Sequence, residues 1–131
     1  MTEGTGVPAP GARTIVLAAE PSSAAAARQF VRDLLRGSRH YGLEDVALLC
    51  VTELVANVSC HTDSTDCVVT VVDEAEDLLI EVADTAGDLP AMESPSRMSE
   101  HGRGLRIIDA LAGEWGVRRR PAGKAVWVRL T

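Results

Sequence analysis

Apolar residues recur along this 131-residue chain with two different periods, and these periods predict its elements. Thr14–Ala18 is a short apolar run that is typical of a strand. From Ala27 to Leu35 the apolar positions follow the three- or four-residue spacing of an amphipathic helix, for which Ser22 or Ser23 is a suitable N-cap. A second helix is predicted from about Leu43 to Cys60.

The middle of the chain favours strands followed by a loop. Asp66–Asp73 and Leu78–Asp84 are rich in branched aliphatic residues and are joined by the acidic turn 74–77, which predicts an antiparallel hairpin. Thr85–His101 contains proline, serine and glycine without a period. We expect a long loop there, and long loops in compact domains often carry function.

The last third predicts a short helix at Leu105–Leu111 and a closing hairpin formed by Trp115–Arg119 and Ala125–Leu130. The order of elements predicts an α+β fold of two layers, with three helices packed on a mainly antiparallel sheet. A single domain is expected over residues 14–131, preceded by a disordered tail over residues 1–13.

Composition narrows the class of protein. Apolar residues make up 46% of the chain but aromatic residues only 3%, so the core should be aliphatic, with Trp115 and Trp127 as its large members. A net charge of −6 disfavours a nucleic-acid surface. We expect neither a membrane span nor a signal peptide. Cys50, Cys60 and Cys67 are odd in number and lie within predicted elements, which indicates reduced thiols and a cytoplasmic protein.

Three polar residues share one face of the second predicted helix. Glu53, Asn57 and His61 are spaced i, i+4 and i+8. A solvated helix face is the simplest interpretation. A phosphate and metal site is the alternative, because an amide oxygen is a hard ligand that suits magnesium and a glutamate can act as a general base. His61 lies at the helix end, where a cation is stabilised by the helix dipole.

Two further segments suggest a ligand site. Asp84 ends an apolar strand, a place where a carboxylate is usually a turn residue. Gly102, Arg103 and Gly104 precede the third predicted helix, so backbone amides at its start could contact phosphate. An isolated Gly-x-Gly is common and is a weak signal by itself.

Taken in order, Glu53–His61, Val82–Gly87 and Gly102–Leu105 resemble the N, G1 and G2 boxes of the GHKL (Bergerat) ATP-binding fold. The small size and the closing segment Gly123–Trp127 resemble the bacterial anti-sigma-factor serine/threonine kinase family. The resemblance implies that Glu53 is the catalytic base, that Asn57 binds magnesium and that Asp84 accepts a hydrogen bond from the adenine amino group. The nucleotide-binding residues that it implies are Asn57, Asp84, Ala86, Gly87, Arg97, Gly102, Arg103, Gly104 and Leu105.

The same resemblance implies ATP and magnesium as cofactors and a role in bacterial transcription regulation. The expected partners are a sigma factor and an anti-sigma-antagonist protein of the STAS type, with no direct contact to nucleic acid or membrane. Relatives of this size are often homodimers. The expected activity is phosphorylation of the antagonist protein.

The sequence departs from the family at three positions, which leaves an alternative open. Ala86 and Asp88 stand where the family has glycine, and Ala125 stands where relatives commonly carry threonine or serine. The alternative is a degenerate GHKL interaction module with weak or no nucleotide binding and no kinase activity. A zinc site formed by Cys60, His61 and Cys67 is a further alternative, and the absence of a CxxC pair argues against it.

The departures generate a first prediction. The double change Ala86→Gly, Asp88→Gly should tighten ATP binding by about tenfold, because it removes a negative charge beside the phosphates and any left-handed strain at Ala86. Calorimetric titration at low and high salt measures the effect; a gain that shrinks at high salt would come from Asp88. An unchanged or weaker affinity would favour the interaction module.

Overall fold

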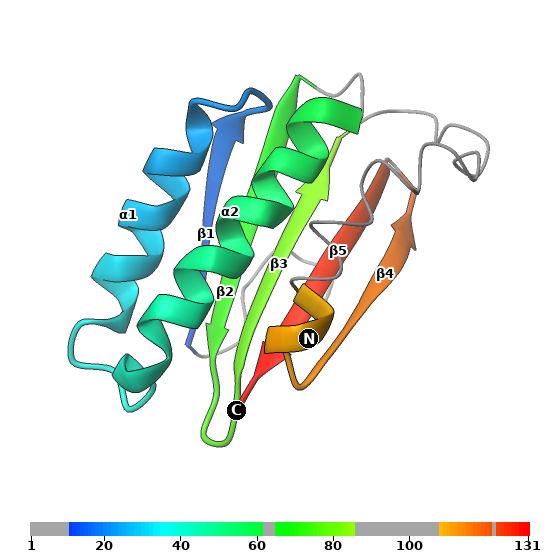
Figure 1. Cartoon of the computed structure of the whole chain (residues 1–131). Coiled ribbons are helices and arrows are strands. Elements are labelled where there is room, and N and C mark those ends of the chain that lie inside the picture. The colour runs from blue at the N-terminus through cyan, green and yellow to red at the C-terminus, as the bar shows by residue number, and fades with distance from the viewer. Residues whose placement is uncertain (1–10, 62–64, 86–107, 122) are drawn as a thin grey trace.

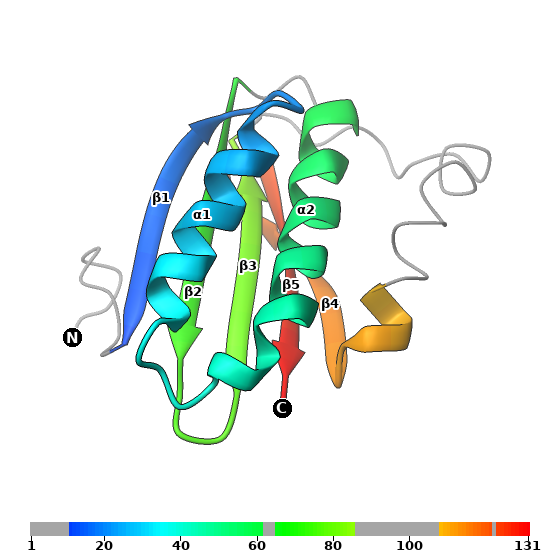
Figure 2. The ribbon, with the colours of Figure 1, turned by 60° about the vertical axis from the view of Figure 1, so that its left-hand side comes forward.

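The computed structural model describes residues 11–61, 65–85, 108–121 and 123–131. A five-stranded sheet in the order β1-β2-β3-β5-β4 carries α1 and α2 side by side on one face (Figures 1 and 2). Residues 108–111 form a further helical turn. The elements are β1 Ala12–Ala18, α1 Ser23–Leu35, the 3-10 turn η1 Tyr41–Leu43, α2 Glu44–His61, β2 Asp66–Asp73, β3 Leu78–Asp84, β4 Glu114–Arg120 and β5 Gly123–Leu130.

The predicted α+β class is confirmed, and every pair of neighbouring strands is antiparallel. The predicted hairpin of β2 and β3 is confirmed with its bounds unchanged. β1 begins at Ala12, earlier than the expected Thr14, and Ala12 is buried. The expected start of the third helix at Leu105 lies outside the described residues.

The core lies between the helices and one face of the sheet. Alternate residues of β3 and β5 pair across the ladder, as in Ile80 with Val128 and Val82 with Val126, and all four are buried. Period-two alternation places such residues on one face, so the helix layer covers a continuous aliphatic surface. The aliphatic core expected from composition is confirmed; its largest fully buried side chains include Leu35, Leu54, Leu78, Ile80, Ile108 and Leu130.

Trp127 is not part of this core, contrary to expectation. It lies on the opposite face of the sheet from its buried neighbours Val126 and Val128, next to Gly116 of β4. The guanidinium of Arg129 lies 5.5 Å from the Trp127 ring centroid. Trp115, by contrast, is half-buried and packs against the core.

The start of α1 also differs from the prediction. Ser22 is the N-cap residue, but its side chain makes no capping hydrogen bond. Its backbone is already helical, with φ −65° and ψ −18°, and its hydroxyl donates to Glu20 at 2.8 Å. A side-chain cap requires an extended N-cap residue, so this serine stabilises the preceding turn instead.

Asp73, at the end of β2, contacts Ser38 and His40 in the connection between α1 and α2. Its Oδ2 accepts a hydrogen bond from the Ser38 hydroxyl at 2.9 Å, and its Oδ1 lies 3.5 Å from Nδ1 of the buried His40. The Ser38 hydroxyl in turn accepts the His40 backbone N–H at 2.9 Å. The aspartate stands between the serine and the histidine, so the histidine does not activate the serine as in a hydrolase triad.

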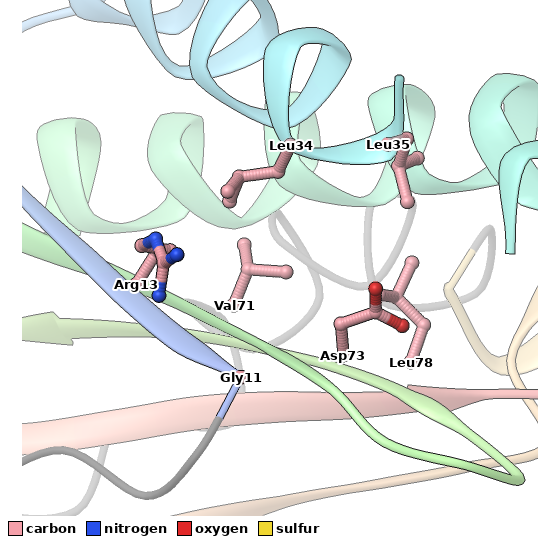
Figure 3. Close-up of a pocket in the computed structure, with 7 residues that line it drawn as sticks. All are labelled: Gly11, Arg13, Leu34, Leu35, Val71, Asp73 and Leu78. Atoms are coloured by element: carbon pink, nitrogen blue, oxygen red, sulfur yellow. The ribbon is translucent and has the colours of Figure 1, made fainter. Parts of the chain in front are cut away.

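A cavity of about 160 Å³ lies beside this cluster, between α1 and the ends of β1 and β2. Figure 3 shows Asp73 and Arg13 at its polar sides and Leu34, Val71 and Leu78 along its apolar walls. Oδ1 of Asp73 and Nδ1 of His40 are both buried, lie 3.5 Å apart and make no hydrogen bond. We therefore assign the cluster a structural role.

This cluster gives a stability prediction. Asp73→Ala should lower the free energy of unfolding by about 1–3 kcal/mol, because Ser38 and the buried His40 lose their carboxylate partner. Urea unfolding followed by circular dichroism measures the change. Glu76→Ala, in the exposed turn of the same hairpin, is the control and should stay within about 0.5 kcal/mol of wild type. Equal stability of the two variants would contradict the structural role.

Candidate functional site

The predicted site residues that the structure describes lie toward one end of the sheet. α2 and β3 run in the same direction, and both end at the upper edge of the molecule in Figure 1. Asp84 is the last residue of β3, while Glu53 and Asn57 belong to the C-terminal half of α2. β5 is antiparallel to β3, so its first residues, Gly123 and Lys124, lie at this same end.

Asp84 is buried in the sheet rather than exposed in a turn. Its relative exposure is 3%, and its backbone pairs with Cys67 of β2. Its Oδ1 accepts a hydrogen bond from the backbone N–H of Lys124 at 3.1 Å. A charged carboxylate is costly to bury unless it is hydrogen-bonded, and this amide supplies one such bond. The turn-residue interpretation of Asp84 is therefore wrong.

Glu53 and Asn57 lie at the border of the packed face of α2. Both are half-buried, and their neighbours Leu54, Val55 and Val58 are buried. A fully solvated face does not describe them, because a half-buried polar side chain retains contact with both protein and water. Such a position suits a residue that meets a ligand at the edge of a core.

The pKa of Cys50 is affected by burial and by the neighbouring Glu53. Burial and, to a smaller extent, the negative charge of Glu53 raise the pKa of the Cys50 thiol to about 11. Cys50 is therefore an uncharged thiol at neutral pH, in agreement with its fully buried position. This thiol is a packing residue and not a nucleophile.

One contact near the site was not anticipated from the sequence. Arg28 of α1 donates from Nη1 to the Thr52 hydroxyl at 3.1 Å, and that hydroxyl donates to the Leu48 carbonyl at 2.7 Å. The contact brings a cation from α1 beside the residue that precedes Glu53. Periodicity placed Arg28 on a helix but gave no signal of the partner, because the partner belongs to another helix.

The remaining predicted site residues lie outside the described residues, and their roles stay predictions. These residues are Ala86, Gly87, Arg97, Gly102, Arg103, Gly104 and Leu105. The side chain of His61 is likewise not described. Among the residues that the structure does describe, no group of three or more His, Cys, Asp or Glu side chains is arranged to hold a metal ion. In the same residues, no helix is long and apolar enough to cross a membrane.

The comparison with protein families identifies the class. The histidine kinase-like ATPase domain family matches residues 17–130, nearly the whole chain. The protein therefore belongs to the histidine kinase-like ATPase domain family, and its fold agrees with that of a GHKL ATP-binding module. No curated protein matches the sequence significantly.

Asn57 provides a test of the site. If Asn57 binds magnesium as predicted, Asn57→Ala should abolish magnesium-dependent nucleotide binding and leave the fold intact, because the change would remove a ligand oxygen from a half-buried side chain. Calorimetric titration of ATP with and without magnesium measures the loss. Asn57→Asp retains a ligand oxygen and should keep the magnesium dependence. The same magnesium dependence in Asn57→Ala and wild type would remove Asn57 from the site.

Proposed function

We propose that this protein is an anti-sigma-factor-like serine/threonine kinase. It would bind ATP with magnesium, phosphorylate an anti-sigma-antagonist protein of the STAS type and sequester a sigma factor. The proposal joins the family assignment to the resemblance of Glu53–His61 and Gly102–Leu105 to the N and G2 boxes. A homodimer and a cytoplasmic location belong to the same proposal.

The observation that carries the proposal is the environment of Asp84. A carboxylate only 3% exposed, with one oxygen on a backbone amide, is a preorganised acceptor at a strand end. Such an acceptor fits the amino group of adenine, because an unpaired buried polar group costs about 1–3 kcal/mol. α2 ends at the same end of the molecule and carries Glu53 and Asn57 in its C-terminal half; a carboxylate and an amide oxygen fit phosphate and magnesium chemistry.

In this mechanism the protein positions the reactants and manages charge. Asp84 orients the base of the nucleotide, and Asn57 supplies a neutral oxygen toward magnesium. Magnesium, when bound, neutralises the phosphate charge that grows during transfer. Glu53 accepts the proton of the attacking serine or threonine hydroxyl, whose oxygen bonds to the γ-phosphorus as the bond to the β-phosphate oxygen breaks.

A second candidate is a protein-interaction module without kinase activity. Ala125 favours it, because this residue is fully buried and pairs with Ala83 beside Asp84, where relatives commonly carry a hydroxyl. Thermal unfolding with ATP and magnesium separates the two candidates. Nucleotide at a hundred times its dissociation constant would add about 2.7 kcal/mol to the free energy of unfolding, whereas the interaction module predicts no change.

Glu53 separates chemistry from binding. Glu53→Ala should lower phosphate transfer by about 10²–10⁴-fold, the usual effect of losing a general base, with little change in ATP affinity. Transfer of labelled γ-phosphate to STAS-type antagonist proteins of the source organism measures the rate. Asp45→Asn removes an exposed charge from the first turn of the same helix and serves as the control. Equal transfer by Glu53→Ala and wild type would exclude Glu53 as the base, and no transfer by wild type would favour the interaction module.

A further inference from the structure

The first two residues of β5, Gly123 and Lys124, both contact the carboxylate end of Asp84 or border it closely. The last ladder pair between β3 and β5 is Ala83 with Ala125, so Lys124 and Gly123 extend past it alongside Asp84. The Lys124 backbone N–H is thereby directed at the side chain of Asp84 and donates to Oδ1 at 3.1 Å. The hydrogen bond fixes which carboxylate oxygen faces the protein.

Gly123 makes this arrangement possible. A Cβ added at Gly123 would lie 2.0 Å from Oδ1 of Asp84 and 2.7 Å from its backbone oxygen, far inside van der Waals contact. The backbone of Gly123 also has φ +104°, a conformation that side-chain-bearing residues rarely adopt. Space and backbone conformation therefore both require glycine at the point where the carboxylate is held.

We infer that Gly123 is a positioning residue for base recognition: together with the Lys124 amide it locks Oδ1 of Asp84 inward and directs Oδ2 at the nucleotide base. The inference rests on the proposed nucleotide-binding function. The terminal torsion of aspartate is broad and roughly two-fold, so an unanchored carboxylate would rotate. An anchored one presents a single acceptor in a single direction.

The consequence is selectivity between adenine and guanine. Adenine presents its N6 amino group as a donor, and guanine presents its O6 oxygen as an acceptor at the equivalent position. A fixed acceptor oxygen pairs with the first and repels the second. Gly123 thereby acts on which nucleotide is bound, through Asp84, and not on the phosphates.

Asp84→Asn tests the anchor directly. The Lys124 N–H needs an acceptor, so it should select the amide oxygen of the asparagine and turn the amide nitrogen toward the base. That nitrogen donates, so the ratio of ATP to GTP affinity should fall at least about tenfold, toward guanine. Calorimetric titrations of each nucleotide with magnesium measure the ratio. Loss of ATP affinity without any shift of the ratio toward GTP would overturn the inference.

Gly123→Ala tests the glycine, with Gly37→Ala as its matched control. Gly37 also has positive φ, +77°, but a Cβ there meets nothing within 4 Å, so the control carries backbone strain without a clash. Gly123→Ala should lower the ATP to GTP ratio at least about tenfold, and Gly37→Ala should leave it at the wild-type value. A merely destabilising effect would lower stability in both variants and move the ratio in neither, which would overturn the inference.

Two outcomes separate this inference from the function on which it rests. Wild type that binds neither nucleotide overturns the proposed function, whereas wild type that binds ATP with an unaltered ratio in Gly123→Ala and Asp84→Asn overturns only the positioning role. If Gly123→Ala does not fold, the ratio of ATP to GTP affinity in Asp84→Asn decides whether the inference stands.

A further test uses the nucleotide-free protein. The amide proton resonance of Lys124 should move in Asp84→Ala and stay unchanged in Gly37→Ala. A resonance that Asp84→Ala leaves unmoved would contradict the hydrogen bond between Lys124 and Asp84.

Discussion

The packing of α2 on the central strands is the constraint on which the site depends. Val51, Leu54, Val55 and Val58 are at most 3% exposed, so one face of this helix is committed to the core. A helix whose buried face is fixed cannot rotate, and its other positions are fixed with it. The half-buried position of Glu53 at the border of the contact is therefore a consequence of aliphatic packing and not of any interaction of its own.

The two ends of the β2–β3 hairpin are each marked by an aspartate, with different consequences. Asp73 lies where the chain turns, and its carboxylate joins Ser38 and His40 to the sheet. Asp84 lies at the far end and is held by a backbone amide of β5. The first aspartate bonds side chains and stabilises a connection. The second is held by the main chain, a rigid support of the kind that a preorganised binding group needs.

Ala125, where the resemblance leads us to expect threonine or serine, follows directly after the backbone amide of Lys124 that contacts Asp84. Ala125 is fully buried and offers no polar atom from its side chain, whereas the backbone N–H of the preceding Lys124 contacts the carboxylate of Asp84. At this position the carboxylate of Asp84 is therefore contacted by the main chain. The alternative of an interaction module draws on the same residue, so Ala125 alone does not choose between the two functions.

Periodicity by itself predicted the two long helices and the β2–β3 hairpin of this protein, because the sequence positions of branched aliphatic residues decide which local conformation can bury them. The bounds of β2 and β3 follow from it, and the turn between them sets their register. Tertiary structure alone decided that the helices cover the face of Val128 and leave Trp127 on the other, since alternation describes two faces without saying which is covered. It alone decided that position 123 has no room for a Cβ, because the atoms that such a Cβ would meet belong to Asp84. Asp84 is distant from Gly123 in the chain, and the pairing of β3 with β5 brings the two residues together.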